Sequence, residues 1–123
     1  MKTITLSKVP PDHLQILQSE LLVYAEGFRD HLKNTEEHGV FLYSIGQVDT
    51  AKTLFKNLRP KVEKNKKVTL TLKLTEAAVL LNACGNATVL STHEYVVHVT
   101  EIYKELINHE LKSMSLTIYL LDQ

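Results

Sequence analysis

Residues 68–74 read VTLTLKL, and this alternation of apolar and polar side chains decides how the rest of the chain is interpreted. The valine and the leucines share one side of an extended segment, and the threonines and Lys73 share the other. A period of two residues is typical of a β-strand with one buried face. Thr75 is then placed to cap a short apolar helix, which Gly85 is expected to end in a left-handed conformation.

Two further segments alternate in the same way, one near each end of the sequence. They are TITLS at residues 3–7 and SMSLTIYLLD at residues 113–122. Apolar residues recur every three or four positions in the intervening segments, which predicts helices there. Pro60 is expected to bend or end the second helix. Ser91 and Glu94 have the spacing of a capping box, which predicts that the last helix starts at Ser91 and runs to about Lys112.

The helical spacing also predicts which side chains are buried. The first long helix has a core stripe comprising Leu14, Leu17, Leu21, Tyr24, Phe28 and Leu32. The second helix carries Leu42, Ile45, Val48, Leu54, Phe55, Leu58 and Val62 at the same kind of spacing. The buried face predicted for the last helix comprises Tyr95, Val99, Ile102, Tyr103, Leu106 and Ile107. Ile16, Val23 and Gly27 lie opposite the first helix's core stripe, and a glycine inside a helix indicates close approach by another element, such as a second subunit.

These elements predict an α+β fold in the order β-α-α-β-α-α-β. Three short strands with one apolar face each favour a small three-stranded sheet with helices packed mainly on one face. A length of 123 residues, of which 44% are hydrophobic, indicates one globular domain over residues 1–123 with a sizeable core. The exposed edges of so small a sheet need protection or a dimer mate.

The composition also bears on the compartment. The most apolar run, residues 77–84, is much shorter than the roughly 20 residues that a membrane span requires. The N-terminal residues contain no apolar run long enough for a signal peptide. The single cysteine, Cys84, rules out an internal disulfide framework. We therefore expect a soluble cytoplasmic protein without membrane contact, and a sequence pI near 7 favours self-association.

The segment from residue 52 to residue 73 holds eight of the fourteen basic residues and only one acid, Glu63. Its formal charge is therefore +7 in a chain whose net charge is zero. Such a charge separation steers partners over roughly the Debye length, about 8 Å at physiological salt. The candidate residues for contact with a partner or with phosphate groups are Lys52, Lys56, Arg59, Lys61, Lys64, Lys66 and Lys67.

Three interpretations of this basic segment remain open. It is a solvated surface, a contact for the phosphate backbone of a nucleic acid, or a contact for an acidic protein surface. No tryptophan or tyrosine lies among the basic residues, so stacking on bases is not indicated. The acidic surface can belong to a second copy of this chain. Complementary acids occur in the last helix, between Glu94 and Glu105, and in the first helix and the loop after it.

One side of the last helix carries a pattern that suits a metal ion. Glu94 and His98, and likewise Glu105 and His109, are four residues apart and share a face with Glu101. Carboxylate and imidazole together suit zinc, iron or manganese, and His31 or His38 from another helix are the candidates to complete the site. The same spacing also occurs on ordinary solvated helix faces, where each charge pair contributes a few tenths of a kcal/mol.

No glycine-rich phosphate loop, nucleophile elbow or paired aspartates occur in the sequence. Cys84 is expected to be a buried, unreactive thiol. We therefore expect a small non-catalytic binding or adaptor protein that needs no cofactor and acts through protein–protein contacts, including contacts with itself. The alternatives are a nucleic-acid-associated accessory protein that uses residues 52–73 and a metal-dependent enzyme built on the Glu94–His109 face.

Overall fold

The computed structural model describes residues 2–34 and 38–114, with the side chains of residues 31–38 left out of that description. The described part is a mixed α+β structure, as the sequence predicts. Its elements, in chain order, are β1 (Thr3–Val9), α1 (Pro11–Asn34), α2 (His38–Glu63), β2 (Val68–Lys73), α3 (Leu74–Leu90) and α4 (Glu94–Lys112). The third strand predicted over residues 113–122 falls almost entirely outside the described residues.

Strands β1 and β2 form an antiparallel sheet of two strands. Ile4 lies opposite Leu72 and Leu6 opposite Leu70, and these four side chains are buried on the face covered by the helices. The threonines of both strands are exposed on the other face. The register shifts between Leu6 and Val9, where Lys8 has a positive φ of 53°. An extra residue of this kind is a β-bulge, and it returns Val9 to the buried face.

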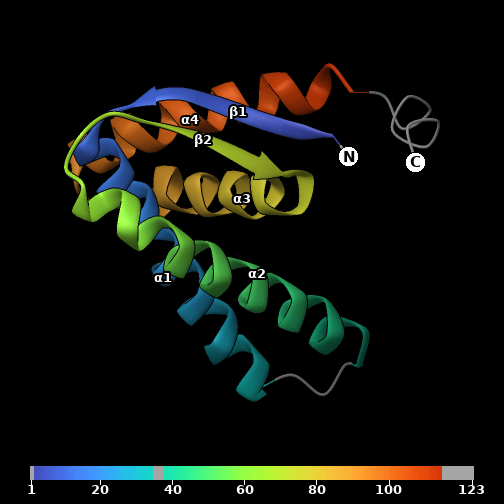
Figure 1. The fold of residues 1–123 in the computed structure, drawn as a ribbon. Coiled ribbons are helices and arrows are strands. Elements are labelled where there is room, and N and C mark those ends of the chain that lie inside the picture. Colours follow the sequence, from blue (N-terminus) through green and yellow to red (C-terminus); the bar gives the residue numbers. More distant parts are fainter. Residues whose placement is uncertain (1, 35–37, 115–123) are drawn as a thin grey trace.

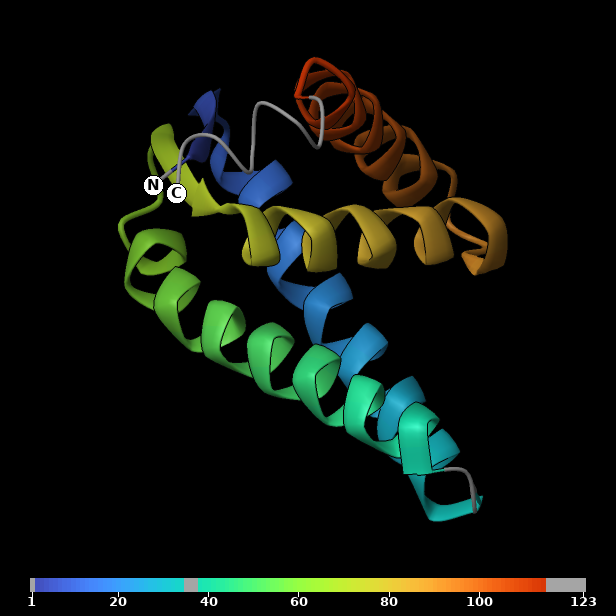
Figure 2. The ribbon, with the colours of Figure 1, turned by 90° about the vertical axis from the view of Figure 1, so that its right-hand side faces the viewer.

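Helices α1 and α2 form an antiparallel hairpin between the two strands (Figure 1). The start of α1 lies next to α3 and α4, and α2 packs against α1 and α3. The far half of the hairpin projects away from α3 and α4, so that the hairpin and α3 diverge like the limbs of a V (Figure 2). We call the projecting half, residues 22–34 and 38–48, the arm.

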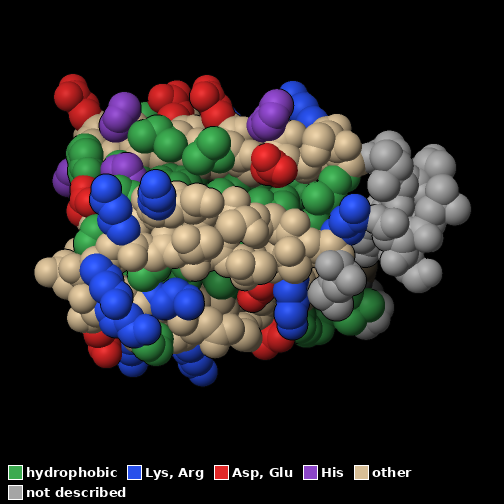
Figure 3. Space-filling model, turned by 45° about the horizontal axis from the view of Figure 1, so that its top comes forward, with side chains coloured by type: hydrophobic (Ala, Val, Ile, Leu, Met, Phe, Trp, Pro, Cys, Tyr) green, Lys and Arg blue, Asp and Glu red, His purple; other side chains and the backbone are tan. Residues whose placement is uncertain are grey.

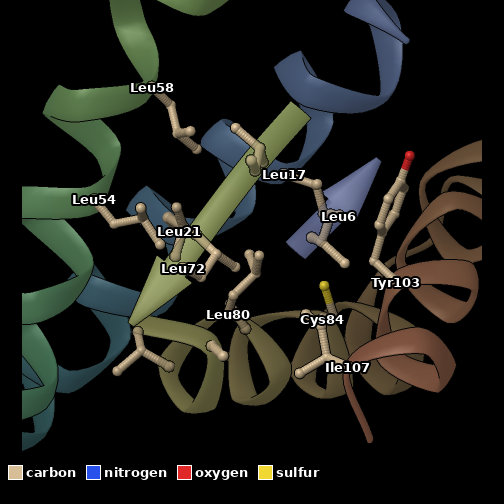
Figure 4. Close-up of a cluster of buried hydrophobic side chains, with 14 of the residues drawn as sticks. Leu6, Leu17, Leu21, Leu54, Leu58, Leu72, Leu80, Cys84, Tyr103 and Ile107 are labelled. Atoms are coloured by element: carbon tan, nitrogen blue, oxygen red, sulfur yellow. The ribbon is translucent and has the colours of Figure 1, made fainter. Parts of the chain in front are cut away.

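One continuous core joins the sheet to all four helices. Leu17 and Leu21 of α1 and Leu80 of α3 are fully buried, and Figure 4 shows them beside Leu6 and Leu72 of the strands. Helix α4 closes the core with a row of side chains one turn apart. That row comprises Val99, Tyr103 and Ile107.

The predicted end of α3 is wrong, whereas α2 ends shortly after Pro60. Gly85 does not end α3, which continues to Leu90, and no described glycine has a positive φ. The helix continues because Ala87, two residues further on, is buried. Its hydrogen bonding continues as well, since the Thr88 hydroxyl donates to the Cys84 carbonyl at 2.9 Å. Pro60 lies inside α2, which ends three residues later at Glu63.

The predicted start and buried face of α4 also need correction. The helix begins at Glu94, and the Ser91 hydroxyl accepts a hydrogen bond from the His93 backbone at 3.2 Å without forming the predicted capping box. Tyr95 and Leu106 are 51% and 49% exposed. Compared with the predicted face, the buried side of α4 is rotated about the helix axis so that it includes Thr100, whose side chain is fully buried. Its hydroxyl stays hydrogen-bonded because it donates to the helix's own carbonyls.

Adjacent leucines on α1 provide a test of this core. Leu21 is fully buried and Leu22 is 38% exposed. We expect Leu21→Ala to lower the free energy of unfolding by about 2–5 kcal/mol, because it removes a packed side chain and leaves a cavity. Leu22→Ala should change it by less than about 0.5 kcal/mol. Urea denaturation of both variants measures the difference, and equal losses would contradict this packing of α1.

Candidate functional site

An apolar groove with a volume of about 580 Å³ lies in the V between α1 and α3. Pockets that bind ligands or partner side chains have this size and character. Residues 20–28 of α1 form one wall, and residues 83–91 at the end of α3 form the other. The lining residues are Glu20, Val23, Tyr24, Gly27, Phe28, Ala83, Asn86, Ala87, Leu90 and Ser91.

The groove continues along α1 into a second hollow of about 400 Å³, which reaches the start of α4. Glu20 lines both hollows, so they adjoin at this residue. The second hollow contains Asp12, Ile16 and Tyr95. The α1 stripe predicted to face another element therefore follows the combined groove, with Ile16 in the second hollow and Val23 and Gly27 in the first.

Gly27 lies in open space. A Cβ atom added to it would meet no atom within 4 Å outside its own helix backbone. No element of the described chain approaches it closely, so the intramolecular packing gives no reason for a glycine here. A glycine inside a helix costs about 1 kcal/mol relative to alanine.

The charged group in the lining of the groove is the carboxylate of Glu20. Partial burial raises its pKa above the usual value for glutamate, and no hydrogen bond or cationic neighbour among the described residues counters that effect. A half-buried carboxylate of this kind is stabilised when a partner brings a positive charge to it.

Hydrogen bonds near the second hollow fix the start of α1 against α4. The Tyr95 hydroxyl donates to the Asp12 carboxylate, and this bond lowers the pKa of Asp12. About two turns further along α4, the Tyr103 hydroxyl lies 2.8 Å from Nδ1 of His13. Burial raises the pKa of Tyr103 to about 12, so it remains a neutral hydrogen-bonding group. These contacts hold the acidic end of the groove in place.

Large apolar side chains surround the first hollow. Val23 is 60% exposed, and Leu90, across the groove, is 76% exposed with Val89 beside it at 78%. The arm's surface is apolar as well. Its exposed large side chains are Leu22, Val23, Phe41, Leu42, Tyr43 and Ile45.

Leu42 and Ile45 were predicted to belong to a core stripe, and the structure shows them exposed. The side of α2 that faces α1 in the arm carries small or polar residues instead. Ser44 is fully buried there, and the Tyr24 hydroxyl donates to the Gln47 side chain at 2.8 Å. The arm therefore exposes several large apolar side chains, which is typical of a surface that another molecule covers.

The basic segment lies at the opposite end of α2 and in the turn that leads to β2. Figure 3 shows lysine and arginine side chains gathered on this end of the molecule. Lys52 and Lys61 are partly buried and the other candidates are exposed. The Arg59 guanidinium lies 5.8 Å from the centre of the Phe55 ring, which is its own neighbour one turn earlier. The structure thus keeps these charges together on one end of the molecule.

The candidate metal ligands Glu94, His98, Glu105 and His109 all lie on the exposed side of α4. Acidic and histidine side chains line that edge in Figure 3. A shallow hollow of about 300 Å³ borders Glu94, His98 and Glu101. Among the described residues, no group of three or more histidine, cysteine or acidic side chains is placed to hold a metal ion. The side chains of His31 and His38 lie outside the described part.

Sequence reasoning missed the α3 wall of the groove because Gly85 was expected to end that helix. Ala83, Ala87 and Leu90 continue at helical spacing across Gly85, and this periodicity was the available signal. The exposure of the arm was missed for a different reason. Helical spacing shows that a stripe exists, but it does not show whether a partner element within the chain covers it.

Comparison with known proteins gives no match: no protein-family model fits the chain, and no curated protein or solved structure matches it. Within the described residues, none of the helices combines the length and the apolar character needed to cross a bilayer. The candidate site is therefore interpreted from its own geometry and chemistry.

Cys84 is buried as predicted, but it lies within α3 instead of at its end. Burial raises the pKa of its thiol to about 12, so almost no thiolate exists near neutral pH. Because the thiolate is the nucleophile, we expect Cys84 in the folded protein to react with a disulfide reagent far more slowly than free cysteine does. The urea-unfolded protein should react at the free-cysteine rate. A fast reaction of the folded protein would contradict the buried position.

Gly27 gives a second prediction. Replacing it with alanine adds a methyl group in open space, so we expect Gly27→Ala to raise the free energy of unfolding of the monomer by about 1 kcal/mol. Denaturation at low protein concentration measures this gain. A loss of stability would show that the helix cannot accommodate a Cβ atom at this position.

Proposed function

We propose that this chain is a small non-catalytic binding protein that acts through protein–protein contacts and associates with itself. The observation that carries the proposal is the preformed apolar groove between α1 and α3, which is bordered by strongly exposed Val23, Val89 and Leu90. Exposed apolar patches with polar rims mark interaction sites in soluble proteins. Burial of these side chains supplies the favourable free energy of association.

The charge distribution supports association with a second copy. The chain is neutral overall, so long-range repulsion between copies is weak. Its basic segment and its acidic helices are complementary, and such complementarity sets the rate and orientation of association more than its strength. The apolar groove has to provide the strength, so association should persist at physiological salt.

The mass of the protein in solution tests this proposal directly. We expect sedimentation equilibrium to show an oligomer whose fraction grows with protein concentration. Leu90→Glu places a charge in the groove and should give a monomer, because burying an unpaired carboxylate is costly. Leu106→Glu is the matched control, since Leu106 is exposed on α4 away from the groove, and it should leave the oligomer intact.

The result that would contradict self-association is a wild-type protein that stays monomeric at low and physiological salt up to high concentration. Dissociation by both glutamate variants would also argue against the groove. In that case the effect would come from added charge in general.

A second candidate function is contact with nucleic acid through the clustered lysines in Figure 3. Phosphate contacts release counterions, so binding through them should weaken steeply between about 50 and 200 mM salt. Fluorescence anisotropy of labelled mixed-sequence DNA and RNA measures this dependence. If the protein acts only through the groove, we expect no binding of DNA or RNA at either salt concentration. Binding that weakens with salt and is lost in Lys64→Glu would favour this second candidate.

A further inference from the structure

The groove and α2 carry matching patterns of apolar and charged side chains. Along the groove, α1 presents Gly27 and Val23 first, then Glu20, and finally Asp12. One side of α2 presents Phe41 and Ile45 first and then Lys52 and Lys56. Each series is thus apolar in its first half and charged in its second half, and the charges have opposite signs.

The lengths of the two series also agree. Gly27 and Asp12 are 15 residues apart on α1, and so are Phe41 and Lys56 on α2. At 1.5 Å per residue, each series extends over about 22 Å. The members of the α2 series are separated by four, seven and four residues, so they share one side of the helix.

We propose that the occupant of the groove is α2 of a second copy of this chain, laid antiparallel to α1. The alignment places Phe41 of the second copy opposite Gly27, its Ile45 opposite Val23 and its Lys56 opposite Asp12. Its Lys52 lies four residues, or about 6 Å, beyond Glu20. The two side chains lean toward each other across this offset, because each leans toward the N-terminus of its own helix and the helices are antiparallel. This inference rests on the self-association proposed above and names the surface that fills the groove.

The structure supplies a reason for each of these contacts. Gly27 leaves open space for a large side chain, and Phe41 and Ile45 are exposed on the arm at 39% and 43%. The carboxylate of Glu20 is partly buried without a cationic neighbour among the described residues, and a lysine there would offset its desolvation. Helix-in-groove recognition uses side chains at such spacings, including four and seven residues.

The arm makes this contact geometrically accessible. It projects beyond the sheet, α3 and α4, so its outer surface can enter the V of another molecule (Figure 2). The contact joins two different surfaces of the same chain. In a two-fold symmetric dimer it is therefore made twice, with each copy providing α2 to the groove of the other.

Disulfide cross-linking between two different variants tests the contact. Val23→Cys and Ile45→Cys change exposed positions, and the buried Cys84 gives little background reaction. We expect a cross-linked dimer when the two variants are mixed and mildly oxidised, and little when either is oxidised alone. The matched control mixes Val23→Cys with Leu106→Cys, whose residue lies outside the groove and the arm, and should give little cross-linking.

The other outcomes separate this inference from the proposed function. Cross-linking of Val23→Cys with itself would show that two grooves face each other, which overturns the α2 contact while self-association stands. The α2 contact is also overturned, while self-association stands, if the protein is an oligomer but the mixed Val23→Cys and Ile45→Cys variants cross-link no more than the control pair. A monomer in sedimentation equilibrium would overturn both.

Charge reversal provides an independent readout of the same alignment. Lys52→Glu places two carboxylates together at Glu20 and should weaken association at least tenfold. Glu20→Lys alone should weaken it as well, because it places two lysines together. Combining the two changes restores opposite charges and should recover most of the affinity. Additive losses in the double variant would overturn the pairing of these residues.

Discussion

The antiparallel pairing of β1 with β2 determines the shape of this molecule. The strands flank the α1–α2 hairpin in the sequence, so the hairpin has to leave the sheet at one strand and return at the other. Strand β1 has seven residues and extends over about 23 Å, whereas α1 has 24 residues and extends over about 36 Å. The helices are thus longer than the sheet beside which they start, and their far ends project as the arm.

This excess length also explains the groove. The buried leucines of α1 lie at positions 14, 17 and 21, next to the sheet and α3. Beyond Leu21, α3 and α1 diverge, and three of the residues between them are small. Gly27 on α1 and Ala83 and Ala87 on α3 cannot fill the widening space, so the V remains open. The groove is therefore a direct consequence of helix length combined with small side chains.

The sequence predicts the parts of the fold that depend on local periodicity. The alternation in VTLTLKL locates β2, and the helical spacing of Leu14, Leu17 and Leu21 locates the buried side of α1. Features that depend on tertiary context could not be predicted in the same way. Gly85 has the local chemistry of a helix end, yet burial of Ala87 carries α3 past it. The same limit applies to the arm, because Leu42 and Ile45 have core-like spacing and differ from core residues only in what packs against them.

The candidate site shows the same division between local and tertiary information. The basic segment is visible in the composition, and the structure keeps it on one end of the molecule. The groove is invisible in the sequence because its walls come from residues about 60 positions apart on two helices. Only the unexplained glycine on α1 pointed toward it.

The way in which the groove is built bears on how it can bind. Both of its walls are helices anchored in the core, and the hydrogen bonds of Asp12 and His13 fix α1 against α4. The groove thus exists before a partner arrives, and little conformational entropy is lost when one binds. A preformed apolar surface cannot discriminate well between apolar partners, because burial is not directional. In the proposed self-association, the charges along α1 supply that discrimination, because a helix that fits the V also has to carry positive charges beyond its apolar side chains. Burial then accounts for affinity and the charges for selectivity, and we propose that α2 of a second copy provides both.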